Sequence, residues 1–194
     1  ISVSFQTEKN HIAADGSEEF WPYLRDPVTL ARPWAIPGTP GLMHRVGGIE
    51  KEDGTGNISY APANHEKMVH LRAAKVAGIA HDIPPAVVVG DADADLVLLG
   101  WGSTWAAIDA AVQRTRRAGT KVAWIHLTHL NPLPPNLGEL LRSFRTVLVP
   151  ELNLGHLCRM VRAEYLVDAK PINKVQGLPF TSAELEAAIT EALS

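Results

Sequence analysis

The chain has 194 residues, of which 46% are hydrophobic and 20% charged, a composition typical of a globular protein with a substantial core. The formal net charge of −3 argues against nucleic acid as a partner, and against a membrane surface bound through basic residues. The single cysteine, Cys158, excludes an internal disulfide and cannot supply the four thiolates of an iron–sulfur cluster. No apolar run could span a bilayer, no secretion signal follows Ile1, and the chain does not begin with Met, so we expect a cytoplasmic piece of a longer protein.

Residues 1–64 are expected to form an extended arm, because they hold six of the 14 prolines and seven of the 15 glycines. A short strand is expected around Met43–Ile49, and a turn over Asp53–Asn57. The arm should pack on its own domain or on a neighbour, because it carries large apolar side chains at Trp21, Tyr23, Trp34, Ile36, Leu42 and Tyr60. A helix capped by Asn64 should follow and run to about Ile79, with an inward face of Met68, Val69, Ala73 and Val76.

From residue 86 onward, apolar runs alternate with helical patterns. The expected strands are Ala86–Val89, Leu96–Gly100, Val122–Leu127, Thr146–Val149 and Ile172–Val175. The expected helices are Thr104–Ala118, Leu137–Phe144, Leu154–Leu166 and Thr181–Leu193, the third with Leu154, Leu157, Cys158, Val161 and Tyr165 inward. Strands that are apolar throughout predict an α/β, doubly wound, mostly parallel sheet covered on both faces, over residues 86–194, after an arm and linking helix over residues 1–85. The short Asp91–Asp93 link predicts a hairpin that makes Ala86–Val89 an antiparallel edge strand.

A glycine-rich turn, Gly100-Trp101-Gly102-Ser103-Thr104, lies between an expected strand and an expected helix. Free backbone N–H groups and the helix dipole could hold an anion at Gly100, Gly102, Ser103 and Thr104, or the turn could serve as an interface loop. A free-standing nucleotide-binding α/β module is therefore an alternative function. Trp105 disfavours it, because the dinucleotide fingerprint needs a small residue there, and the acid expected after the next strand is missing. A plain turn and helix start is the simpler interpretation.

Two further groups follow strand ends. His126 and His129 end one strand, and an H-x-x-H pair on extended backbone points to opposite faces, which disfavours a metal site. Glu151 and Asn153 end the next, where Asn153 could cap a helix and Glu151 should face the same crevice as His126. A Glu and a His across a crevice could act as an acid/base pair, but they more often order two loops through hydrogen bonds. No metal ligand set and no complete catalytic site is predicted.

The remaining reactive or charged groups have structural interpretations. Cys158 lies on an apolar helical face and should be buried and inert. A basic cluster at a helix C-terminus offsets the helix dipole, and it consists of Arg114, Arg116, Arg117 and Lys121. A second set, Lys67, Arg72 and Lys75, forms either a solvated helix face or an anion-binding edge.

Several strings are more specific than any of these patterns. In chain order they are Pro22–Asp26, Arg32–Gly41, His44–Glu50, Asn57–Tyr60, Asn64–Met68, Leu99–Thr104, His129–Pro132 and Pro150–Gly155. Together they resemble the carboxyl-terminal third of the alpha subunit of bacterial 2-oxoglutarate:ferredoxin oxidoreductase, over nearly the whole chain. One departure is visible, because many relatives have a histidine where this chain has Lys51.

The resemblance implies an enzyme that oxidatively decarboxylates 2-oxoglutarate with coenzyme A as co-substrate and ferredoxin as electron acceptor. It implies thiamine diphosphate, Mg and a [4Fe-4S] cluster in the whole complex, with the diphosphate-binding motif and the cluster cysteines on a beta subunit. This chain then corresponds to a domain like the carboxyl-terminal domain of transketolase, plus the arm leading into it. No catalytic residue of the family can be transferred to it, so the implied role is structure and assembly with the remaining domains of the alpha subunit and with the beta subunit.

Overall fold

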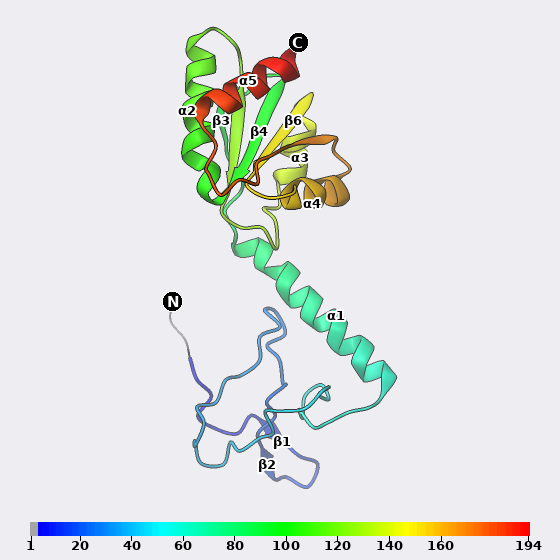
Figure 1. Ribbon diagram of the computed structural model, residues 1–194. Helices are drawn as coiled ribbons and strands as arrows, with labels where there is room; N and C mark the ends of the chain where they lie inside the picture. Colours follow the sequence, from blue (N-terminus) through cyan, green and yellow to red (C-terminus); the bar gives the residue numbers. More distant parts are fainter. Residues whose placement is uncertain (1–3) are drawn as a thin grey trace. The chain divides into compact units, whose positions relative to one another are not determined.

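The computed structural model describes residues 4–194, and the chain divides into two compact units, Ile1–Ile79 and Ala80–Ser194 (Figure 1). The division falls a little before the boundary expected at residue 85. No helix among the described residues has the length and apolar character needed to cross a membrane.

The first unit is mostly irregular chain held by turns. Its only paired strands among residues 4–79 are β1 (His11–Ile12) and β2 (Glu18–Glu19), which form an antiparallel hairpin. The expected turn is present after residue 52, where the Gly56 N–H donates to Glu52 O and the Glu52 N–H donates to Asn57 O. Gly54 and Gly56 have φ of 80° and 71°, and a Cβ on either would lie under 3.0 Å from Trp21, Pro22 or Tyr23. Two glycines are therefore required where this turn packs on the aromatic segment.

The helix of the first unit differs in detail from the expectation. α1 (Pro62–Gly78) begins with Pro62 at its first position, which suits a residue that lacks an N–H. Asn64 does not cap it. Its side chain accepts from the Asp53 N–H and donates to Lys51 O, so it ties α1 to the preceding turn instead. Of the four side chains expected inward, only Met68 is buried.

The strand expected around Met43–Ile49 is absent. The segment pairs with no strand, and Met43, Val46 and Ile49 are more than four-fifths exposed. A segment without a partner strand cannot form a β-ladder.

The second unit is the expected α/β domain, with a five-stranded sheet in the order β3-β5-β4-β6-β7. A short 3-10 helix, η1 (Ile79–Asp82), precedes it, and a second, η2 (Gly102–Thr104), follows β4. The strands are β3 (Val88–Gly90), β4 (Leu96–Trp101), β5 (Ala123–Leu127), β6 (Thr146–Glu151) and β7 (Ala169–Asn173). Strands β5, β4, β6 and β7 are parallel to one another, and β3 is antiparallel at the edge. The doubly wound, mostly parallel sheet is confirmed.

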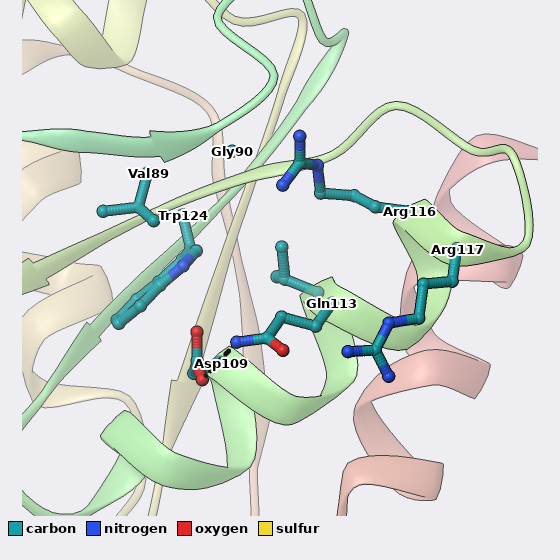
Figure 2. A pocket seen from close by; sticks show the side chains of 8 residues that line it. Val89, Gly90, Asp109, Gln113, Arg116, Arg117 and Trp124 are labelled. Atoms are coloured by element: carbon teal, nitrogen blue, oxygen red, sulfur yellow. Dashed lines mark hydrogen bonds between the residues drawn. The ribbon is translucent and has the colours of Figure 1, made fainter.

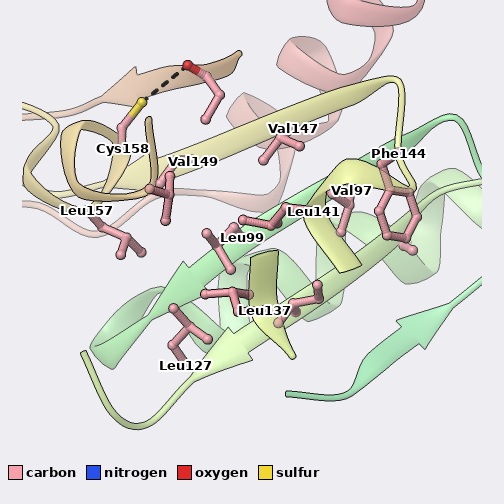
Figure 3. Close-up of a cluster of buried hydrophobic side chains, with 14 of the residues drawn as sticks. Val97, Leu99, Leu127, Leu137, Leu141, Phe144, Val147, Val149, Leu157 and Cys158 are labelled. Carbon is pink, nitrogen blue, oxygen red and sulfur yellow. Dashed lines mark hydrogen bonds between the residues drawn. The ribbon is translucent and has the colours of Figure 1, made fainter. Parts of the chain in front are cut away.

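Helices cover both faces of this sheet. Helices α2 (Trp105–Arg117) and α5 (Ser182–Leu193) pack on one face, where Ile108, Ala111, Leu185 and Ile189 meet the side chains of Leu96, Leu98 and Trp124. Helices α3 (Leu137–Arg142) and α4 (His156–Tyr165) pack on the other, and Figure 3 shows their side chains over the alternate residues of the same strands. Burial on both faces explains why these strands are apolar throughout.

Three local predictions for this unit are wrong. β3 is an antiparallel edge strand, but it pairs with β5 and not with β4, because both edges of β4 are occupied by β5 and β6. Leu154 is exposed, because α4 begins only at His156. The last strand ends at Asn173 and not at Val175, because Glu151 at the end of β6 leaves nothing further to pair with.

Candidate functional site

The glycine-rich turn after β4 is closed by its own side chains. The Thr104 hydroxyl donates to Trp101 O at 2.8 Å and accepts from the Trp101 N–H at 3.2 Å, and Thr104 is 5% exposed. Gly100 is needed for close packing, because a Cβ there would lie 2.3 Å from Ile108 Cδ1. Gly102 has φ 56°, and no atom lies near the position of its missing Cβ. Ser103 is exposed. The two glycines thus have turn and packing roles, and the anion-binding role stays a prediction.

The two histidines at the end of β5, His126 within the strand and His129 after it, differ in burial and in their contacts. His126 is partly buried, its Nδ1 faces the missing side chain of Gly100 at 3.6 Å from an ideal Cβ, and this nitrogen has no hydrogen-bond partner among the described residues. Burial lowers the pKa of His126, so it is held as a neutral imidazole at neutral pH. His129 is exposed and its Nδ1 contacts only the neighbouring Thr128 hydroxyl, at 3.0 Å. Among residues 4–194, no three His, Cys, Asp or Glu side chains come together as a metal site.

Glu151 is the centre of a buried hydrogen-bonded group. It is fully buried, and its Oε1 accepts from the Leu157 N–H at 2.8 Å, from Asn153 Nδ2 at 3.1 Å and from Trp101 Nε1 at 3.3 Å. Its Oε2 accepts from the Cys158 N–H at 3.0 Å. Two of these donors are backbone groups in the first turn of α4 that have no partner inside the helix. Asn153 completes this helix start, since its Oδ1 accepts from the N–H groups of Gly155 and His156 at 2.7 and 2.9 Å.

Glu151 and His126 do not share a crevice, and the expectation that they could form an acid/base pair is wrong. The parallel register aligns His126 with Gly100, whereas Glu151 contacts the indole of Trp101, the next residue of β4. Successive residues of a strand point to opposite faces of the sheet. His126 therefore lies on the α2/α5 face with Trp124, and Glu151 lies on the α3/α4 face with Leu157 and Cys158.

A mainly apolar pocket of about 380 Å³ lies beside His126. Trp105 and Trp124 line it with their rings edge to face, at a centroid distance of 5.9 Å, and Pro84 and Val87 line it from the segment before β3. Its polar groups are His126, Thr128 and Asp109. Asp109 already accepts from Gln113 Nε2 at 2.8 Å.

A second pocket of about 430 Å³ lies between β3 and α2, and Figure 2 shows the side chains that line it. Arg116 at its rim is held by Asp91, with Nε and one terminal nitrogen at 2.7 and 2.9 Å from the two carboxylate oxygens. This pair lowers the pKa of Asp91 and raises that of Arg116. Two other members of the basic cluster also find acids, because Arg114 pairs with Glu186 at 3.4 Å and Lys121 pairs with Asp93. Arg114 and Arg116 therefore link α2 to Glu186 on α5 and to Asp91 after β3.

Cys158 is buried, and its thiol donates to Ala169 O at 3.4 Å (Figure 3). Burial raises the pKa of this thiol, so it is the neutral, unreactive form that packs between α4 and β7.

One polar site was missed by the sequence patterns. A pocket of about 830 Å³ in the first unit is lined by Arg25, Arg32 and Lys75, together with Trp34. The signal available in the sequence was the pair of arginines inside the two strings Pro22–Asp26 and Arg32–Gly41.

Comparisons with known proteins identify a family model and several relatives that match this chain. The family described as pyruvate:ferredoxin oxidoreductase core domain II matches residues 94–185. The 2-oxoglutarate oxidoreductase subunit KorA of Mycobacterium tuberculosis is 52% identical over 186 residues, which is 95% of this chain and 28% of that protein. The alpha subunit of 2-oxoacid:ferredoxin oxidoreductase 1 of Aeropyrum pernix is 31% identical over 150 residues, 73% of this chain and 24% of that protein.

One solved structure covers both units. It is 2-oxoglutarate:ferredoxin oxidoreductase from Magnetococcus marinus with 2-oxoglutarate, coenzyme A and succinyl-CoA bound, and it matches 95% of this chain with a TM-score of 0.83 at 30% identity. The chain covers 32% of that structure's chain, so it spans about a quarter to a third of the proteins it matches. This chain is therefore homologous to part of the alpha subunit of the 2-oxoglutarate:ferredoxin oxidoreductases.

Proposed function

We propose that the chain serves structure and subunit assembly within the alpha subunit of a thiamine-dependent 2-oxoglutarate:ferredoxin oxidoreductase. The observation that carries the proposal is 52% identity to the Mycobacterium tuberculosis subunit over 95% of this chain. The whole enzyme would convert 2-oxoglutarate and coenzyme A to succinyl-CoA and carbon dioxide, and pass two electrons to ferredoxin. The Magnetococcus marinus relative was solved with the substrate and the product of this reaction bound.

The cofactors of that reaction would be held outside this chain. A [4Fe-4S] cluster needs four thiolates, and the sequence has one cysteine, Cys158, which is buried in the core. The glycine-rich turn after β4 is closed by Thr104 and has no lysine or acid that would hold a diphosphate and its Mg. Thiamine diphosphate, Mg and the cluster would therefore lie on other parts of the complex, which by family resemblance include a beta subunit.

The residues of the second unit would act as scaffold. Glu151, the most buried acid at the carboxyl edge of the sheet, is occupied by four donors and so is not placed to move a proton to a substrate. His126 has a nitrogen without a hydrogen-bond partner among the described residues, and the acid in its pocket, Asp109, accepts from Gln113 Nε2 instead. These two facts support a bracing role, like that of the transketolase carboxyl-terminal domain, for residues 80–194.

The first unit would supply assembly contacts. Among residues 4–79 only Leu42 and Met68 are fully buried hydrophobic side chains. Large apolar side chains that are more than half exposed include Trp34, Met43, Ile49 and Tyr60. Surfaces rich in aromatic residues and methionine are common at protein interfaces.

A chimera tests the proposal directly. The homologous segment of the Mycobacterium tuberculosis subunit would be replaced by residues 1–194 and the protein purified with its partner subunit. We expect a stable complex that reduces a dye only when 2-oxoglutarate and coenzyme A are both present. A chimera that folds but fails to hold its partner, or that assembles and prefers another 2-oxoacid, would contradict the proposed assembly role or the proposed substrate respectively.

A further inference from the structure

The pocket of the first unit has an excess of positive charge. Arg25, Arg32 and Lys75 line it, and none of the three forms a salt bridge with any residue from 4 to 194. Residues 1–3, which are Ile, Ser and Val, carry no side-chain carboxylate. The pocket therefore holds three cations without a carboxylate partner from the described chain.

The acids near this pocket are committed elsewhere. Asp26 lies in its lining, but its Oδ1 accepts from the N–H groups of Val28 and Thr29 at 3.0 and 2.6 Å and closes a turn. Asp53 pairs with Lys67 at 2.7 Å, and Glu50 pairs with His65 and Arg72. The chain thus neutralises its neighbouring cations and leaves these three.

Of the three cations, Arg25 has a buried donor without an acceptor among the described residues. One terminal nitrogen donates to Leu30 O at 2.9 Å, which holds the loop after Asp26, but its Nε is buried and has no partner among the described residues. Burial lowers the pKa of Arg25, the charge of Asp53 partly opposes this, and the charge of Arg32 lowers the pKa further. A buried donor on a charged group is costly unless an acceptor reaches it, and a bidentate anion is the acceptor that a guanidinium fits best.

The walls of the pocket add a flat, apolar component. The Arg32 guanidinium lies 4.2 Å from the centroid of the Tyr23 ring, within the range of a cation–π contact. Trp34 and Phe5 line the same pocket and are 63% and 45% exposed. A volume of about 830 Å³ is within the range of small-ligand sites.

We propose that the pocket between Arg25, Arg32 and Lys75 binds a small organic anion in which a phosphate or carboxylate is joined to a planar ring. The anionic group lies against the two guanidinium groups, and the ring lies against Trp34. The two strings Pro22–Asp26 and Arg32–Gly41, which the scaffold role leaves without a function, meet at this site. The proposal does not depend on the activity of the whole enzyme.

Calorimetric titration of the full 194-residue chain tests it. The probes are AMP, which joins a phosphate to a ring, benzoate, which joins a carboxylate to a ring, and inorganic phosphate and adenosine, which each supply one half. We expect AMP or benzoate to bind at least tenfold more tightly than phosphate and adenosine, and the stronger of the two identifies the anionic group. If none of the four probes gives measurable binding at millimolar concentration, the proposal is wrong.

Variants separate the site from the fold. Arg25→Gln and Arg32→Gln should each weaken binding by about tenfold or more, whereas Arg45→Gln, an exposed arginine of the same unit outside the pocket, should leave it unchanged. Arg25→Gln could also loosen the loop that Leu30 O anchors. Lys75→Gln avoids this, because Lys75 is an exposed residue of α1 with no hydrogen bond among the described residues, and it should weaken binding by a few-fold without changing the melting temperature. The site would be wrong if Lys75→Gln and Arg32→Gln both bound the probe as tightly as the unchanged chain. It would also be wrong if Arg45→Gln lost as much affinity as the pocket variants.

Discussion

Glu151 offers the sharpest test of the structure, because a fully buried carboxyl group surrounded only by donors should be sensitive to the exchange of one oxygen for an amide. In Glu151→Gln, the amide oxygen can keep the three donors now at Oε1. The new NH₂ group then faces the Cys158 N–H, which at present donates to Oε2 at 3.0 Å. One buried backbone donor loses its acceptor and meets a second donor.

The expected cost follows from this count. An unsatisfied buried donor costs about 1–3 kcal/mol. Against a domain stability of about 5–15 kcal/mol, this leaves the second unit folded but clearly weakened. The melting temperature should fall by roughly 2–8 °C for each kcal/mol lost. Glu151→Leu removes all the acceptors at once and should cost considerably more than Glu151→Gln, because the first turn of α4 then has no partner for two N–H groups.

The assay is urea denaturation followed by tryptophan fluorescence, since Trp101 contacts Glu151 directly. Glu139→Gln is the matched control, because Glu139 lies exposed on α3 and the same chemical change there should shift the unfolding free energy by less than about 0.5 kcal/mol. If Glu151→Gln were as stable as this control, the four hydrogen bonds would not have the role assigned to them. The group would then be available for chemistry after all.

Three further changes test other parts of the fold. Gly100→Ala should cost about 1–3 kcal/mol, because the new Cβ would lie 2.3 Å from Ile108 Cδ1, and Ile108→Val in the same chain should recover part of that loss in thermal unfolding. The salt bridge to Lys174 and the Thr181 cap lower the pKa of Glu184 to about 2, so the stabilising effect of Glu184 is full above pH 4.5 and is lost as the pH falls toward 2. Over this interval the unfolding free energy of Glu184→Gln should fall less steeply with decreasing pH than that of the unchanged chain. Parallel plots of unfolding free energy against pH for the two proteins would contradict this. Deletion of residues 1–45 should leave residues 80–194 folded by circular dichroism and weaken co-purification with the remaining domains and the partner subunit; unfolding of residues 80–194, or undiminished assembly, would show that the arm has another role.

The doubly wound sheet could be predicted because its three central strands are long enough and apolar enough to be recognised in the sequence. β4, β5 and β6 are six, five and six residues long, and almost every position in them is buried, so a continuous apolar run marks them in the sequence. The last helix is expected to begin at Thr181, and Thr181 is its N-cap, where it forms a capping box with Glu184.

Strand order and side-chain facing could not be predicted in the same way, because they depend on contacts between distant segments. The Asp91–Asp93 link is short enough for a hairpin, but only the whole sheet determines that β5 is the partner of β3. The facing of Glu151 depends on the register between β4 and β6, and a shift of one residue would have placed it on the same face of the sheet as His126. The prediction of an acid/base pair failed at this step, although both residues lie at the carboxyl ends of parallel strands, β5 and β6, which are separated by β4.

The two units differ in how much apolar surface they bury, and this difference affects the stability of the arm. The second unit buries a continuous core on each face of its sheet, whereas the described part of the first unit buries two large apolar side chains, Leu42 and Met68. Two buried side chains provide little apolar burial to offset the conformational entropy that is lost when the rest of the unit is ordered. Turns closed by glycine and proline lower that entropy loss but do not remove it. The exposed apolar side chains of the arm outside the Arg25–Arg32–Lys75 pocket, such as Met43, Ile49 and Tyr60, can add to the stability of the first unit when a surface outside it covers them.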